Sequence, residues 1–147
     1  MFNHFKQLHY KKFKHSFVKI ATIIVRVLLG LALTASALTY FLGMMPKDPM
    51  PGTAGQFVGA LMTSGAFNFV KICELAAGLM LLAGFQVPLA LLIWFPINIV
   101  IILFHTMMAP FNPAVLVFLF FTLFLAWVYK SNFAPIFNTG NAWVTQK

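Results

Sequence analysis

Residues 67–85 read FNFVKICELAAGLMLLAGF and decide the fold class of this chain. A helix that crosses a membrane needs about 20 mostly apolar residues, and this stretch has that length although it contains Lys71 and Glu74. At the centre of a bilayer these two charges together cost roughly 5–7 kcal/mol, while the Leu, Ile, Phe and Val residues around them return roughly 3–5 kcal/mol. Insertion of the segment alone is therefore marginal, so the sequence predicts that both charged groups find partners inside a helical assembly.

The remainder of the chain has the composition of a membrane protein. Of its 147 residues, 61% are hydrophobic and 8% are charged, and the mean hydropathy is +0.91. An ordinary soluble domain carries roughly 25% charged residues, so that class is excluded. Together with the first stretch, three more apolar stretches predict four membrane spans, at about 20–44, 67–85, 88–108 and 113–129.

The connections between the predicted spans carry turn residues. Gly84 is placed to end the second span and Pro88 to begin the third, while Asn112 and Pro113 are placed to begin the fourth. Connections this short join antiparallel neighbours. The predicted fold is therefore all-α, an integral membrane four-helix up-down bundle. Residues 56–63 predict a short helix at the membrane face before the second span, and one longer tilted helix is the alternative.

Basic residues predict the orientation of the chain, whose net charge is +8. Five lysines precede the first span and two follow the fourth, whereas the loops on the other side contain only Lys47. The positive-inside rule then places both termini in the cytoplasm, including a tail at 138–147. Residues 1–19 predict a basic amphipathic helix on an anionic leaflet. Alternatively these lysines only fix the topology, and the two interpretations are compatible. Nucleic acid is not an expected partner.

Polar residues within the predicted spans indicate a site. Lys71 and Glu74 are three residues apart and share one helical face. Counted from the span ends, His105 of the third span lies at a similar depth, roughly 5–6 Å inside the non-cytoplasmic surface. The predicted ligand-binding set therefore consists of Lys71, Glu74 and His105, together with Asn68, Tyr40 and Ser36. Among these, Glu74 and His105 are the candidates for proton transfer. The structural alternative is a buried ion pair that holds helices in register.

Three other polar or helix-breaking residues have structural interpretations. Arg26 lies near the cytoplasmic end of the first span, where its side chain reaches the interface. Pro96 is expected to kink the third span, and Asn98 to satisfy backbone groups that the kink frees. Cys73 is the only cysteine and Glu74 is one of only two acidic residues, so no disulfide and no metal site is expected.

Part of the chain resembles a known family of small membrane proteins. The segment 69–84, FVKICELAAGLMLLAG, is its most specific part; the matching features farther along are the Pro88-Leu-Ala-Leu run, Pro96, Phe104-His105, Trp127-Val-Tyr129-Lys130 and Phe133-Ala-Pro135. Over roughly residues 20–137 these features resemble the DoxX family. The resemblance implies a four-span protein of the bacterial inner membrane, and some members of that family are linked to quinone-dependent redox complexes.

Three hypotheses about function follow. In the first, the chain is a membrane subunit or accessory of a quinone-linked redox system, in which Glu74 and His105 exchange protons with a quinone headgroup and a partner protein supplies electrons. In the second, it is a non-enzymatic, transporter-like protein that binds a lipid or an anionic solute through Lys71 and forms a homodimer. Small residues such as Gly30 and Thr34 are then expected at helix contacts. In the third, it is a structural scaffold of a membrane complex.

Overall fold

The structure is a computed structural model that describes residues 2–45 and 50–137, with side chains described for 16–45 and 50–135. Within these residues the chain forms helices and no strand: α1 (Phe2–Phe41), α2 (Gly52–Thr63), α3 (Ala66–Ala83), α4 (Val87–Met107), α5 (Ala114–Val128) and α6 (Lys130–Phe137). The prediction of an all-α fold is confirmed. The predicted tail at 138–147 lies outside the described residues.

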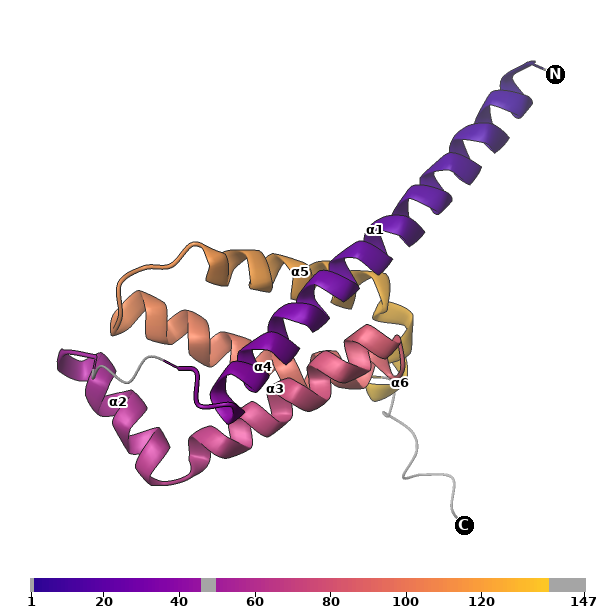
Figure 1. The fold of residues 1–147 in the computed structure, drawn as a ribbon. Coiled ribbons are helices and arrows are strands. Elements are labelled where there is room, and N and C mark those ends of the chain that lie inside the picture. The colour runs from indigo at the N-terminus through magenta and orange to yellow at the C-terminus, as the bar shows by residue number, and fades with distance from the viewer. Residues whose placement is uncertain (1, 46–49, 138–147) are drawn as a thin grey trace, which may run out of the picture.

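Helices α1, α3, α4 and α5 pack against one another (Figure 1). Helix α3 packs against α1 and α4, and α5 packs against α4 and α1, so each of the four has two neighbours. Their shared core contains residues from all four helices, namely Leu29, Leu33, Ala77, Leu81, Val87, Ala90, Leu91, Trp94 and Leu125. Many other large apolar side chains, such as Phe69 and Phe120, are exposed, as expected for helices that face lipid rather than water.

Within the described residues, three helical segments are long and apolar enough to cross a membrane: Ser16–Phe41 within α1, Ala66–Ala83 and Val87–Met107. Together they indicate a membrane protein. Helix α5 is also apolar but has 15 residues, about 22 Å at 1.5 Å per residue. Apart from the start of α1, the observed helix ends lie within a few residues of the predicted span ends.

The connections use the predicted turn residues. Gly84 ends α3 in the left-handed conformation with φ 68°, and its N–H donates to the carbonyl of Leu81. A residue with a side chain adopts this conformation only under strain. Before α5, the side chain of Asn112 accepts a hydrogen bond of 3.0 Å from the N–H of Ala114, which satisfies one of the free donors of the first turn.

The region before α3 forms the separate short helix that the sequence predicts. Helix α2 covers Gly52–Thr63, and Gly65, with φ 77°, separates it from α3. The alternative of one longer helix is wrong, because the left-handed backbone at Gly65 interrupts the helical path. The ring of Phe57 on α2 lies 5.8 Å from the ring of Phe104 near the end of α4, so α2 packs across the end of the assembly.

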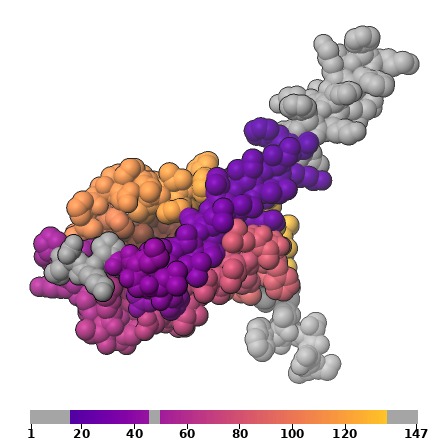
Figure 2. All heavy atoms as spheres, viewed as in Figure 1, coloured from indigo at the N-terminus to yellow at the C-terminus, as the bar shows by residue number. Residues whose placement is uncertain are grey.

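The N-terminal segment is not a separate element. The backbone of α1 is helical without a break from Phe2 to Phe41, and its N-terminal part extends beyond the other helices (Figure 1). Figure 2 shows the described side chains of α1, in indigo, beside those of the helices against which it packs. Helical hydrogen bonding continues through residue 19, so no break in the backbone separates the predicted N-terminal segment from the first span. The predicted amphipathic pattern falls mostly on residues 1–15, whose side chains lie outside the described part.

Candidate functional site

The charged residues of α3 form a compact cluster with one residue of α1. Lys71 Nζ lies 2.7 Å from Glu74 Oε2. Ser36 of α1 accepts a hydrogen bond of 2.9 Å from Lys71 Nζ and donates one of 3.0 Å to Glu74 Oε2. Lys71 is 6% exposed and Glu74 3% exposed. We refer to Ser36, Lys71 and Glu74 as the ion cluster; the sequence predicts all three as members of one site.

Helical geometry explains the pairing of Lys71 with Glu74 but not their contact with Ser36. Residues three apart lie on the same helical face, so Lys71 and Glu74 pair within α3 without help from another helix. Ser36 supplies the link to α1, and it does so through one hydroxyl that both donates and accepts. The ion cluster therefore neutralises both charges and also joins α1 to α3.

Glu74 uses only one of its two carboxylate oxygens in the ion cluster. Among the described residues, Oε2 accepts hydrogen bonds from Lys71 and Ser36, whereas Oε1 accepts none. Oε1 is also not one of the fully buried polar atoms that lack a partner, which are found on Arg26, Thr34 and Asn98. This second oxygen is the part of the ion cluster that is free to meet a ligand or a proton.

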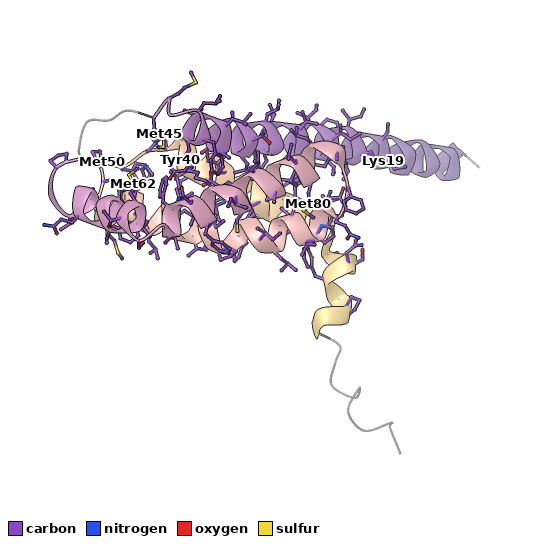
Figure 3. All side chains as sticks on the ribbon, turned by 60° about the horizontal axis from the view of Figure 1, so that its bottom comes forward. Lys19, Tyr40, Met45, Met50, Met62 and Met80 are labelled. Carbon is purple, nitrogen blue, oxygen red and sulfur yellow. The ribbon has the colours of Figure 1, made fainter. Side chains whose placement is uncertain are left out.

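A polar contact lies one helical turn farther toward the start of α3. The hydroxyl of Tyr40 donates to Asn68 Oδ1, and the Tyr40 ring meets the Phe67 ring edge-on at 5.1 Å. Lys71 Nζ lies 5.3 Å from the centre of that Phe67 ring, within the range of a cation–π contact. Tyr40 and Asn68 are thus connected to the ion cluster through Phe67. Figure 3 shows Tyr40 at the same end of the assembly as Met62, with Met80 and Lys19 toward the other end.

Small residues allow α1 and α3 to approach closely. A Cβ atom added to Gly78 would lie 2.5 Å from Thr34 Oγ1 and 3.0 Å from the carbonyl oxygen of Gly30. The sequence predicts Gly30 and Thr34 at helix contacts in a homodimer. In the structure they form a contact within one chain, because they face Gly78 of α3.

The contacts along this interface define one antiparallel register. Gly30 and Thr34 meet Gly78, Ser36 meets Lys71 and Glu74, and Tyr40 meets Asn68. The α3 partner moves toward the start of α3 as the α1 residue moves toward the end of α1. The close approach at Gly78 therefore holds the ion cluster and the Tyr40–Asn68 contact at fixed positions.

His105 is not bonded to the ion cluster. Its Nδ1 lies 2.9 Å from the carbonyl oxygen of Ile101, one turn earlier in α4, and its ring meets the Phe104 ring at 5.2 Å. No hydrogen bond or ion pair between the described side chains joins His105 to Lys71 or Glu74. The prediction of three converging ionisable groups is therefore confirmed only for Lys71 and Glu74.

The helix connection explains the position of His105. Helix α3 ends at Ala83 and α4 begins at Val87, so residues equally far from this turn lie opposite each other. At 1.5 Å per residue, His105 lies about 27 Å from the turn and Glu74 about 13 Å. In the sequence analysis, the depths of Glu74 and His105 were counted from the predicted span ends that lie away from this turn. Those ends are less sharply defined than the turn, so the two residues appeared to be level.

The structure gives described contacts for the residues with structural predictions. Helix α4 continues through Pro96. Asn98 donates through Nδ2 to Thr122 Oγ1 of α5 at 3.1 Å, so its described contact is with a side chain rather than with the backbone near Pro96. The Arg26 guanidinium lies against Gly84 at the end of α3, where a Cβ would be 2.5 Å from one of its nitrogens. Its Nε is buried with no hydrogen-bond partner among the described residues.

Sequence reasoning did not single out Thr122. This residue is buried, and its hydroxyl accepts hydrogen bonds from Trp94 and Asn98. The signal was present in the sequence, because Thr122 is the only polar residue within Ala114–Val128. In the described part of the chain, no group of three or more His, Cys, Asp or Glu side chains is placed to hold a metal ion.

Comparison with family models, curated proteins and solved structures finds no match to this chain. The class of protein therefore rests on the fold and the site. Three apolar helices of spanning length, with a neutralised ion cluster buried between two of the helices, define a helical membrane protein.

Proposed function

We propose that the chain is a DoxX-like protein of a bacterial cytoplasmic membrane that spans the bilayer four times, with α1, α3, α4 and α5. Helix α5 supports the fourth span, since it is apolar along its length and packs against both α4 and α1. At about 22 Å it is shorter than the hydrocarbon core, and local thinning of the bilayer accommodates such a mismatch. The excess of lysines before the first span and after the fourth places both termini in the cytoplasm.

Cysteine labelling tests this topology. In a Cys73→Ala background, Thr53→Cys in α2 and Ser131→Cys in α6 introduce single thiols at exposed positions. A membrane-impermeant maleimide added to intact spheroplasts is expected to label the thiol at position 53, and the thiol at position 131 only after permeabilisation. Labelling of both positions in intact spheroplasts, or of position 131 alone, contradicts the proposed topology.

The proposed function is binding of a quinone headgroup at the ion cluster, as a subunit or accessory of a quinone-linked redox system. The single observation that carries this proposal is the retention of a buried Lys71–Glu74 pair with one carboxylate oxygen unused. Well-packed apolar residues usually hold helices together at least as well as a buried ion pair. Intramembrane ionisable residues commonly mark ligand or proton sites.

The chemistry of the site follows from its groups. Reduction of a quinone to a quinol takes up two electrons and two protons. Glu74, when protonated, delivers one proton through Oε1, and the Lys71 ammonium stabilises the anionic oxygen that forms on electron transfer. His105 lies about 14 Å farther from the turn between α3 and α4 than Glu74, which is too far to serve the same headgroup directly, so the second proton comes from water. The electrons come from a partner redox protein.

Titration of the purified protein with a ubiquinone or menaquinone analogue tests this function. Saturable binding is expected for the natural sequence, and at least about tenfold weaker binding for Glu74→Gln, equivalent to about 1.4 kcal/mol. Cys73→Ala is the matched control, since Cys73 neighbours Glu74 but forms no described bond with the ion cluster. A lack of saturable binding, or equal binding by Glu74→Gln, contradicts the proposal.

A structural scaffold is the second candidate, favoured by the internal hydrogen bonding of the ion cluster. Ser36, Lys71 and Glu74 satisfy one another without a ligand. If the cluster only joins α1 to α3, the double substitution Lys71→Met/Glu74→Met folds and retains function in a complementation assay. Loss of complementation by a folded double variant excludes the scaffold and leaves the ligand site.

A further inference from the structure

A second buried polar cluster lies between α4 and α5. It consists of Trp94, Asn98 and Thr122, which are 2%, 1% and 1% exposed. The Thr122 hydroxyl is its centre: it donates to the carbonyl oxygen of Phe118 at 2.7 Å and accepts from Trp94 Nε1 at 3.0 Å and from Asn98 Nδ2 at 3.1 Å. None of these three side chains carries a charge.

The bonding of Thr122 fixes the orientation of the Asn98 amide. A hydroxyl has one proton to donate and two lone pairs to accept with. The proton of Thr122 is used by Phe118, so the Asn98 atom facing Thr122 is a donor, Nδ2. Turning the amide around would place Oδ1 against Thr122 Oγ1, whose proton is already used, and would also leave both N–H bonds of the amide without a partner. Oδ1 therefore points away from Thr122.

Asn98 Oδ1 is buried and receives no hydrogen bond from the described residues. A buried acceptor left without a donor costs about 1–3 kcal/mol. Within a bilayer no bulk water is present to reduce this cost. Buried polar groups in proteins are almost always paired, and internal water is the usual partner where the chain supplies none.

Both charged residues of α3 lie near this level: Glu74 is about 3 Å closer than Asn98 to the turn between α3 and α4, and Lys71 is about 1.5 Å farther from it. Counted from the turn between α3 and α4, Glu74 lies about 13 Å and Asn98 about 17 Å along their helices. The two helices pack together, and both residues are more than nine-tenths buried. Glu74 Oε1 accepts no described hydrogen bond, so both helices present an unused acceptor at similar depth inside the assembly.

We propose that Asn98 Oδ1 binds an internal water molecule in the core, at the level of Glu74. One O–H bond of the water pairs with Asn98, and the second is available to the Glu74 carboxylate or to a further water. The proposal stands on the geometry of Asn98 and does not depend on quinone binding.

X-ray radiolytic labelling of the full chain in ¹⁸O-labelled water tests the site directly, because a side chain modified by hydroxyl radicals while buried must have water beside it. Trp94 and Asn98 donate to the same Thr122 hydroxyl, so labelling of Trp94 is the quantity measured. Trp94 is expected to be labelled with ¹⁸O in the natural sequence and labelled several-fold less in Asn98→Leu. Trp127, which is exposed, is the internal control and should be unchanged. An unlabelled Trp94 in the natural sequence overturns the proposal.

Thermal unfolding in detergent gives a second measurement that separates the two amide atoms. In Thr122→Val the Asn98 amide has lost its described partner. If water binds Oδ1, adding Asn98→Leu to Thr122→Val lowers the midpoint further, by about 2–4 °C. If nothing binds Oδ1, removal of the unpaired amide leaves the midpoint unchanged or raises it, which contradicts the proposal.

A ligand hydroxyl is the other source of an O–H donor. Native mass spectrometry of the purified protein distinguishes it from water. A bound lipid or quinol that is present in the natural sequence and absent from Asn98→Leu, together with an unlabelled Trp94, would replace water by that ligand. Labelled Trp94 without a co-purifying ligand supports the water.

Discussion

The interfaces α1–α3 and α4–α5 join apolar helices in opposite ways. Between α1 and α3 the backbones approach closely at Gly30 and Gly78, and a charged pair is buried beside the contact. Between α4 and α5 the described polar contacts are neutral, and one hydroxyl, that of Thr122, receives two donors. The α1–α3 interface depends on glycines, which have no side chain to hold the helices apart. The α4–α5 interface depends on the Thr122 hydroxyl, whose proton and two lone pairs are all used in hydrogen bonds.

This difference teaches where each interface is vulnerable. Inside a membrane, helices associate through close packing and interhelical hydrogen bonds, since lipid tails are as apolar as leucine. A charge without its partner is the most expensive defect, an added methyl group at a close contact is next, and a lost neutral hydrogen bond is the smallest. The two interfaces should therefore respond to substitution in that order.

Lys71→Met should have the largest effect. It leaves the Glu74 carboxylate buried with Ser36 as its only described partner, and loss of one member of a buried pair costs about 3–5 kcal/mol. The free energy of unfolding in detergent micelles measures this cost. In Lys71→Met/Glu74→Met the cost should fall to about 1 kcal/mol or less. A double variant as unstable as the single one would show that packing, rather than charge, dominates this interface.

Gly78→Ala should be the next most damaging change. The new Cβ would lie 2.9 Å from the backbone nitrogen of Thr34 and 3.0 Å from the Gly30 oxygen, so α1 and α3 must separate, at about 1–3 kcal/mol. The same assay applies. Gly59→Ala in α2 is the matched control, since its Cβ would meet nothing within 4 Å, and it should be neutral or stabilising. Equal effects at both positions would argue against the close approach.

Thr122→Val tests the α4–α5 interface. The substitution keeps the shape of the side chain and removes the hydroxyl to which Trp94 and Asn98 donate, at an expected cost of about 1–2 kcal/mol in unfolding free energy. Thr106→Val is the control, because Thr106 is exposed and bonds only to carbonyls of its own helix. A Thr122→Val variant as stable as its control would mean that apolar packing alone holds α5.

Ser36→Ala should have the smallest effect. Lys71 and Glu74 keep each other as partners, so the change removes hydroxyl bonds but not charge balance, and the expected cost is about 0.5–1.5 kcal/mol. Thr39→Ala on the same helix, whose hydroxyl bonds only to Ala35, is the control. A loss as large as that of Lys71→Met would show that Ser36, and not the ion pair within α3, holds the two helices together.

The sequence was sufficient to predict helices α2 to α5 and the pairing of Lys71 with Glu74, but it did not predict α6. Apolar stretches of spanning length and turn residues at Gly84 and Asn112 gave helix ends close to those observed. A spacing of three residues fixes two side chains on one face of a helix, whatever the rest of the fold does. The sequence did not predict that α1 continues without a break into the N-terminal segment, because helix propensity and charge do not show where a helix leaves the membrane.

Contacts between helices were predicted less well. Ser36 and Tyr40 were expected near the ion cluster and lie beside it, but His105 and Asn98 have other contacts. Relative depth depends on the turn that joins two helices and on the residues at which their backbones approach. An error of a few residues in a span end moves a side chain by a full helical turn.

The sequence by itself determined that this chain is helical and apolar, and that two charges share one face of its third helix. Only the tertiary structure decided which residues complete each polar cluster: Ser36 for Lys71 and Glu74, and Thr122 for Trp94 and Asn98. The physical reason is that hydrogen bonds within a helix are set by its fixed rise and twist, whereas those between helices depend on how closely and in what register two surfaces pack.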